Sequence, residues 1–139
     1  MRSFPMTETG RIGKRMNILA VSSNAAILAE LEGILKELYP GAAVTCAGDP
    51  LMAGKYAFHN KVDILLAETE MKRMNGVQLL RFVRQEQPAV RACLMGRADT
   101  LRDLPLSVQG EAAGLIAIPF TAADVAAALC GGAAEGREE

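Results

Sequence analysis

Glu68 has the clearest chemical setting in this sequence, because its carboxylate directly follows the apolar run at residues 64–67. A short apolar run of this kind predicts a buried strand, and Glu68 then stands at the carboxyl end of that strand. In open parallel sheets ligands usually bind at this edge, so the carboxylate could contact a ligand. A solvated carboxylate without a role explains the position equally well. Asp49 and Glu70 could lie along the same edge and offer a metal site together with Glu68.

The cysteines and the single histidine offer little further chemistry. The three cysteines are far apart, odd in number and set among apolar residues; they are Cys46, Cys93 and Cys130. This spacing favours neither a disulfide framework nor a metal cluster, so we expect reduced cysteines that pack as small apolar residues. His59 has no cysteine or second histidine near it with which to share a metal, and a place on a helix surface is the simpler interpretation.

The elements that must position these side chains follow a regular order. From Met16 onward, short apolar runs alternate with longer segments of helical period, which is typical of βα units around a parallel sheet. We expect five units, with strands at residues 17–21, 43–47, 64–67, 92–95 and 115–118. The helices are expected at residues 25–38, 50–59, 77–87, 104–112 and 121–129. Ser22, Ser23 and Asn24 can cap the first helix, and Gly131-Gly132 is expected to end the last.

Length and charge limit the classes of function. The chain has 139 residues, half of them apolar, which is enough for one domain with a single buried core. We place this domain at residues 16–130, between a leader at 1–15 and a charged tail at 131–139, both expected to be flexible. The net charge of −1 gives no field that would attract nucleic acid or an anionic membrane. Because no secretory signal or membrane-spanning run stands out, we expect a cytoplasmic protein.

The central segment resembles the receiver domains of two-component response regulators. In that family an aspartate ends the third strand, and a Met-Pro-x-Met-Asp-Gly loop leads into the third helix. Here residues 62–68 read VDILLAE and residues 71–76 read MKRMNG, so Lys72 and Asn75 replace the proline and aspartate. Residues 113–120, AGLIAIPF, resemble the family's fifth strand with its Lys-Pro-Phe ending. The resemblance covers residues 16–129 and implies a (βα)5 flavodoxin-like α/β fold. That fold is a doubly wound sheet of five parallel strands in the order 2-1-3-4-5, with helices on both faces.

Members of this family transfer a phosphoryl group to their own aspartate, which requires positioning and neutralisation of charge. An acidic pair holds Mg²⁺ with that aspartate, and a hydroxyl and a lysine contact the phosphate. Carried over by position, the acidic pair falls on Ser22 and Ser23 and the acceptor on Glu68. The hydroxyl falls on Gly96 and the lysine on Ile118. The resemblance therefore implies a degenerate pocket in which the Mg²⁺ site is lost.

Each of these positions also has a plain structural explanation. The two serines can be helix caps, Gly96 a turn and Ile118 one more buried apolar residue. The side chain of Glu68 is one methylene longer than aspartate, which would displace the reacting oxygen by about 1 Å and slow transfer about a hundredfold. We therefore expect a pseudo-receiver that is not an enzyme and acts through protein–protein interaction. The alternative is an atypical regulator that is still phosphorylated at Glu68 with an altered metal site.

The last helix is the expected contact surface, because a row of alanines makes it smooth; they are Ala122, Ala123, Ala126, Ala127 and Ala128. Alanine is also the best helix former, which explains the row without a contact. The partner would be another protein or a second copy, held through the last helix and strand. Nucleic acid is not expected, because a solvated helix face explains the modest basic cluster; the cluster is Lys72, Arg73, Arg81 and Arg84.

Overall fold

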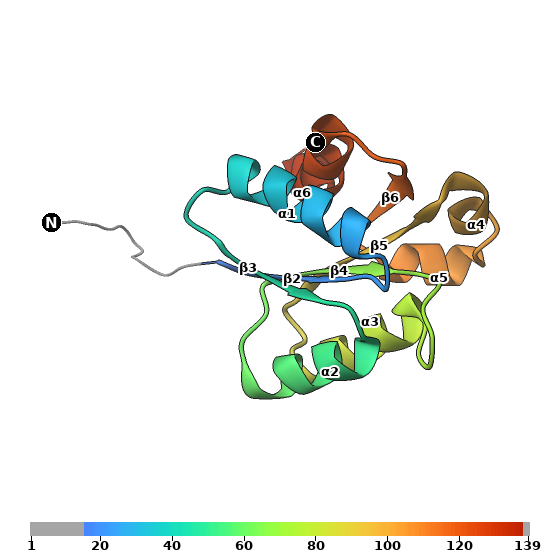
Figure 1. Ribbon diagram of the computed structural model, residues 1–139. Helices are drawn as coiled ribbons and strands as arrows, with labels where there is room; N and C mark the ends of the chain where they lie inside the picture. Colours follow the sequence, from blue (N-terminus) through green and yellow to red (C-terminus); the bar gives the residue numbers. More distant parts are fainter. Residues whose placement is uncertain (1–15, 138–139) are drawn as a thin grey trace, which may run out of the picture.

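The computed structural model describes residues 16–137, so the predicted leader at 1–15 lies outside the described residues. Five parallel strands form one sheet in the order β3-β2-β4-β5-β6, with helices on both faces (Figure 1). The strands are β2 (Asn17–Val21), β3 (Ala43–Ala47), β4 (Ile64–Glu68), β5 (Arg91–Arg97) and β6 (Gly114–Ile118). This is the 2-1-3-4-5 order in sequence terms, so the predicted fold class is confirmed.

The helices divide between the two faces of the sheet. The helices are α1 (Ala25–Leu38), α2 (Pro50–His59), α3 (Gly76–Glu86), α4 (Ala98–Arg102), α5 (Leu106–Glu111) and α6 (Ala122–Arg137). Figure 1 shows α1 and α6 above the sheet and α2 and α3 below it. The short helix α4 contacts β5 and β6. No helix in the described part of the chain is long and apolar enough to cross a membrane.

The core has two layers because side chains along a strand alternate between the faces of the sheet. In β4, Ile64 and Leu66 pack in the layer under α1 and α6, and Leu65 and Ala67 pack in the layer over α2 and α3. All four are buried, which explains why this strand is a continuous apolar run rather than an alternating one. The polar residue that ends such a run is therefore the first that can reach the surface.

Helix caps position the loops at the carboxyl end of the strands. Asn24 Oδ1 accepts hydrogen bonds from the backbone N–H groups at the start of α1, at 2.9 and 3.3 Å. Asp49 caps α2 in the same way, and Asn75 forms a reciprocal capping box at the start of α3. The prediction that Ser22 and Ser23 also cap α1 is wrong, because Asn24 alone supplies that cap.

Three predictions differ from the structure by more than one residue. Strand β5 runs on to Arg97, so Gly96 lies within a strand and not in a turn. The predicted helix 104–112 is replaced by α4 and α5, because Pro105 lacks an N–H and stands between them as the N-cap of α5. The last helix continues through Gly131-Gly132 to Arg137, since alanines on both sides of the glycines favour helix. The predicted end at 129 is thus wrong, while the flexibility of the tail stays a prediction.

Candidate functional site at the carboxyl end of the sheet

The strand register brings the pocket positions to one edge of the sheet. Val21 pairs with Ala67, Glu68 with Met95, and Gly96 with Ala117. The parallel strands therefore end together, and the positions taken from the family resemblance lie along this edge; they are Ser22, Ser23, Glu68, Gly96 and Ile118. Their contacts differ, and these contacts decide what the edge can do.

Ser22 and Glu68 form the central contact of this edge. Ser22 is fully buried, and its Oγ donates a hydrogen bond of 2.6 Å to Glu68 Oε1. The same Oγ accepts a hydrogen bond of 3.0 Å from the backbone N–H of Asn24. A hydrogen bond from a hydroxyl to a carboxylate is short and strong because the acceptor is charged. Ser22 thus connects β4 to the loop before α1, and half of the Glu68 carboxylate already has a partner within the chain.

Two further family positions, Ser23 and Ile118, make no polar contact with Glu68. Ser23 is exposed, and its hydroxyl makes no hydrogen bond to another described residue. Ile118 is half-buried and packs against the core layer of α1 and α6, so it is less buried than predicted. Neither residue can bring a charge to Glu68, which leaves a single carboxylate at the centre of the edge.

Thr69 is a residue of this edge that sequence reasoning missed. It is only 5% exposed, and its hydroxyl has no hydrogen-bond partner among the described residues. A Cβ added at Gly96 would lie 2.7 Å from Thr69 Oγ1, closer than such atoms approach in folded proteins. The Thr69 hydroxyl therefore occupies space that a side chain at position 96 would need. The signal in the sequence was a hydroxyl directly after Glu68 combined with a glycine at position 96.

The suggested metal site of Asp49, Glu70 and Glu68 does not form. Asp49 Oδ1 caps α2 at 2.8 Å from Leu51 N, and its Oδ2 pairs with Arg73 Nη1 at 3.0 Å. Glu70 is exposed. Among the side chains that the structure describes, no three histidine, cysteine, aspartate or glutamate residues come together in a way that could hold a metal ion.

Basic side chains instead line a hollow at the start of α2. A hollow of about 140 Å³ is lined by Ser23, Gly48, Asp49, Pro50, Lys72 and Arg73. Arg73 has a left-handed backbone (φ 75°), which is uncommon for a residue with a side chain, and its guanidinium reaches across to Asp49. Lys72 is exposed and makes no ion pair with another described residue. This edge thus combines the carboxylate of Glu68, two basic side chains, and an aspartate that already caps α2 and pairs with Arg73.

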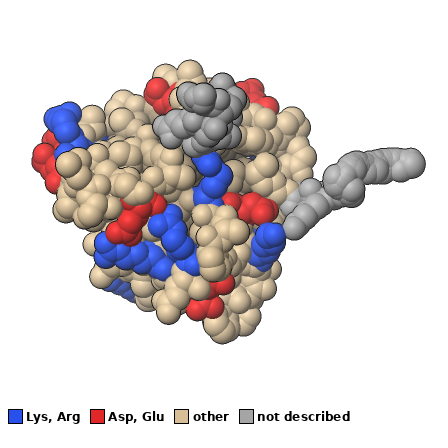
Figure 2. Space-filling model, turned by 180° about the vertical axis from the view of Figure 1, so that it is seen from behind, with Lys and Arg blue, Asp and Glu red and all other residues tan. Residues whose placement is uncertain are grey.

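The remaining basic residues of the predicted cluster serve a structural role. Arg81 donates two hydrogen bonds, at 2.9 and 2.8 Å, to the carboxylate of Glu111, and Arg84 donates one to the Glu111 backbone carbonyl. The Arg81 hydrogen bond lowers the pKa of Glu111 and raises that of Arg81. Figure 2 shows acidic side chains among the basic ones on the rear face. Within the predicted basic cluster, Arg81 and Arg84 therefore link α3 to α5, and Arg73 pairs with Asp49.

The two cysteines with described side chains differ in exposure. Cys46 is exposed on β3, so the expectation that it packs in the core is wrong, because β3 is an edge strand. Cys93 is buried, and desolvation raises its pKa to about 11 despite the opposing charge of Arg91. The side chain of Cys130 lies outside the described residues. His59 lies exposed at the end of α2, where its ring meets that of Phe58 edge to face.

The surface of α5, β6 and α6 presents apolar side chains. Leu106 on α5 is 83% exposed, and Leu115 and Ala117 on β6 are also exposed. On α6, Ala122, Ala123 and Ala127 are exposed and Ala126 is half-buried. The prediction that Ala128 belongs to this smooth surface is wrong, since it is buried in the core. Because α4 and α5 are short, they leave the outer part of β6 uncovered.

Comparison with known proteins identifies the family. Residues 18–130 match the response regulator receiver domain model, and the chain belongs to that family. It is 30% identical over 107 residues to a protein-glutamate methylesterase/protein-glutamine glutaminase from Pseudomonas syringae pv. tomato, covering 76% of this chain and 29% of that protein. It is 35% identical over 68 residues to stress response regulator protein 1 of Lodderomyces elongisporus, covering 49% of this chain and 19% of that protein. The chain thus spans less than a third of the length of these relatives.

Solved structures agree with the fold. A receiver domain protein from Clostridium thermocellum has a TM-score of 0.72 at 20% identity, with 88% of this chain and 97% of that one covered. The receiver domain of a Pseudomonas aeruginosa PAO1 sensor histidine kinase has a TM-score of 0.70 at 22% identity, with 84% and 96% covered. That structure holds a magnesium ion coordinated in its active-site cleft. At these identities, the likeness establishes the fold and not the state of the site.

Proposed function

We propose that this chain is a pseudo-receiver: a receiver domain that takes part in signalling through protein–protein contacts and is neither phosphorylated nor an enzyme. The observation that carries the proposal is the Ser22–Glu68 hydrogen bond of 2.6 Å. It links the acceptor position to a neutral side chain at a place where the family has a carboxylate. The domain keeps the scaffold that presents a binding surface, while the groups that would drive a phosphoryl transfer are replaced.

The side chains at this edge do not fit Mg²⁺. This ion requires near-octahedral oxygen ligands and is usually held by one or two carboxylates with waters and phosphate oxygens. Here Glu68 is the one carboxylate, Asp49 is taken by Arg73 and the α2 cap, and Lys72 and Arg73 line the adjoining hollow. Asp49 is thus already neutralised, and Lys72 adds a positive charge that opposes a divalent cation, so we propose that the family's magnesium site is lost and that no other cofactor replaces it.

The alternative is phosphorylation at Glu68 with an altered metal site. Glu68 Oε2 accepts no hydrogen bond from another described residue, and Lys72 and Arg73 could attract a phosphodonor. However, an acyl phosphate on glutamate would need the charge neutralisation that a cation or the missing lysine supplies, and half-buried Ile118 offers none. We therefore retain this alternative only as an outcome of the test.

A phosphorylation assay distinguishes the pseudo-receiver proposal from phosphorylation at Glu68. The full chain is incubated with Mg²⁺ and acetyl phosphate, and its intact mass is measured. We expect no phosphate adduct and no heat in a calorimetric titration with Mg²⁺. The matched control is a triple variant, Ser22→Asp with Ser23→Asp and Glu68→Asp, which restores three carboxylates and should gain Mg²⁺ binding. An adduct on the natural chain that Glu68→Ala abolishes would overturn the proposal and establish the alternative.

For the partner surface, we propose the face of α5, β6 and α6. Exposed Leu106 and Leu115 support this face, and the exposed alanines of α6 would allow another helix to approach closely. A second copy is one partner that could use it, and neither nucleic acid nor membrane is proposed as a partner in a cytoplasmic setting. Sedimentation at high concentration should reveal self-association that Leu106→Glu weakens. A strict monomer at every concentration would count against the homodimer.

A further inference from the structure

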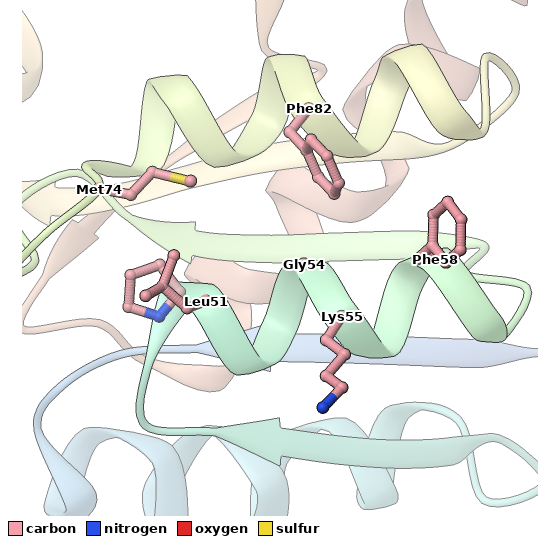
Figure 3. A pocket seen from close by; sticks show the side chains of 7 residues that line it. Leu51, Gly54, Lys55, Phe58, Met74 and Phe82 are labelled. Atoms are coloured by element: carbon pink, nitrogen blue, oxygen red, sulfur yellow. The ribbon is translucent and has the colours of Figure 1, made fainter.

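A second apolar surface lies on the opposite side of the domain, between α2 and α3. A groove of about 280 Å³ is lined by Pro50, Leu51, Gly54, Lys55, Phe58, Met74 and Phe82. Figure 3 shows the ring of Phe82 pointing from α3 toward α2 and that of Phe58 standing on α2 at one end of the groove. Lys55 extends from α2 on the side away from α3, so that its ammonium lies at the outer rim.

The exposure of the lining is unusual for side chains of this size. Leu51 is 48% exposed, Phe58 63% and Phe82 36%. Leu51 and Phe58 are seven residues apart in α2 and therefore share one face of that helix. Gly54 lies between them, and a Cβ there would be 3.3 Å from the Phe82 ring, so its absence lets that ring lie close against α2. Clustered exposed apolar side chains of this kind mark interaction sites.

The charges around the groove are mainly positive. Helix α2 has no acidic residue, and Lys55 makes no ion pair with any described residue. At the loop end of the groove, Arg73 neutralises Asp49, and the nearby Lys72 is also unpaired. At the other end, Glu86 lines a separate hollow that also contains Lys61 and His59. The unpaired charged side chains described around the groove are therefore positive, apart from Glu86 at one end.

We propose that this groove docks an acidic amphipathic helix of a partner protein. Helix α2 has 10 residues, about 15 Å in length, which matches a docked helix of about three turns. Apolar side chains one and two turns apart on that helix would fill the space between Phe58, Phe82 and Leu51, and its acidic side chains would face Lys55 and Lys72. The inference rests on the proposed binding function and gives it a second surface, distinct from the face of α5, β6 and α6.

Charge argues against the two other occupants that this chain itself offers. In a symmetric dimer the same patch meets itself, so Lys55 of one copy would approach Lys55 of the other across a low-dielectric contact. The segment at residues 1–15 has four basic residues and one acidic residue, so it would meet the same repulsion. An acidic helix of another protein would bury the apolar lining and would also place carboxylates beside the unpaired lysines.

The probe is a fluorescent helical peptide of about 15 residues with leucines at i, i+3, i+4 and i+7 and glutamates on both flanks. The control peptide has lysines in place of the glutamates. Anisotropy should show that the full chain binds the acidic peptide about tenfold more tightly than the basic one, and the amide resonance of Gly54 should shift on binding. We expect Phe58→Ser to weaken binding of the acidic peptide about tenfold and Lys55→Glu to reverse the preference between the peptides.

The matched control is Met52→Ser, which removes an apolar side chain of α2 that is 65% exposed and does not line the groove, and it should leave binding unchanged. Equal binding of the two peptides, binding of neither, or an equal loss in Met52→Ser would overturn the proposal. So would self-association that Phe58→Ser abolishes, or a Gly54 shift caused by a peptide of residues 1–15. None of these results depends on the phosphorylation assay. A failure of the groove therefore leaves the pseudo-receiver proposal standing, and a phosphate adduct on Glu68 would overturn that proposal without changing the peptide result.

Discussion

The carboxyl end of the sheet and the groove between α2 and α3 use their side chains in opposite ways. At the sheet edge, polar groups bind one another: Ser22 binds Glu68, and Asp49 binds Arg73. In the groove, apolar groups remain in contact with solvent, and Lys55 has no partner among the described residues. At the edge that the family uses for chemistry, polar side chains thus already have partners within the chain, whereas the groove leaves apolar side chains exposed. The difference supports the proposal that this chain acts through burial of apolar surface against a partner.

Substitution of one glycine in each region, Gly76 at the sheet edge and Gly54 in the groove, should give the largest difference in the free energy of unfolding. A Cβ at Gly76 would collide with the backbone carbonyl of Glu68, which cannot move without disturbing β4. We expect Gly76→Ala to lower the free energy of unfolding by about 3 kcal/mol, because the collision is with backbone at the end of a packed strand. Urea denaturation followed by circular dichroism measures this change.

Gly54→Ala is the matched substitution in the groove. There the neighbour of the added Cβ is the partly exposed Phe82 ring, which can shift. Alanine also favours the helix, so this variant should be unchanged or up to about 1 kcal/mol more stable. If Gly54→Ala destabilised the chain as much as Gly76→Ala, the groove would be as tightly packed as the sheet edge, and the contrast would be lost.

Removal of the Ser22 hydroxyl should have the next largest effect on the free energy of unfolding. Ser22→Ala leaves a partly buried carboxylate oxygen and the Asn24 N–H without their partner, and we expect a loss of about 2 kcal/mol. Ser23→Ala serves as the control, since its hydroxyl is exposed and makes no described hydrogen bond, and should change stability by less than about 0.5 kcal/mol. Equal effects in thermal or urea unfolding would mean that the Ser22–Glu68 contact does not hold the edge together.

A smaller effect of opposite sign is expected at Thr69. Its hydroxyl is buried against Gly96 without a partner among the described residues, and valine has nearly the same shape. Thr69→Val should therefore raise the free energy of unfolding by about 1 kcal/mol. The same denaturation assay tests this, and a clear loss of stability would show that the hydroxyl has an important hydrogen bond.

The smallest effect should come from the ion pair on the side of α3 away from the groove. The pKa of Glu111 lies below its ordinary value because Arg81 donates hydrogen bonds to its carboxylate. Arg81→Gln should return that pKa toward the ordinary value, as an NMR titration of the glutamate carboxyl can show. A carboxyl with a lowered pKa stabilises the fold above its unfolded pKa, and this support is lost as the pH falls through the folded pKa. Because the pair is exposed, the change in stability should be slight and weaker still in salt.

Much of the fold was predictable because its signals are local. The apolar runs at 64–67 and 115–118 and the helical periods between strands depend on near neighbours in the chain. The five strands and the helices after the first three strands were confirmed. Boundaries were less predictable where local rules compete. Gly131-Gly132 suggested a helix end, yet the surrounding alanines carry the helix onward, and Pro105 separates what looked like one helix into two.

The sequence by itself determined which chemical groups are present, including the neutral residues at positions 22, 23, 96 and 118 and the single carboxylate at 68. Only the tertiary structure decided which of them meet. Ser22 and Glu68 are 46 residues apart, and their hydrogen bond depends on the register of β2 against β4. The packing of Thr69 against Gly96, and the groove built from α2 and α3, depend in the same way on how separate elements lie together. The physical reason is that periodicity and capping act over a few residues, whereas register and packing bring distant side chains within contact distance.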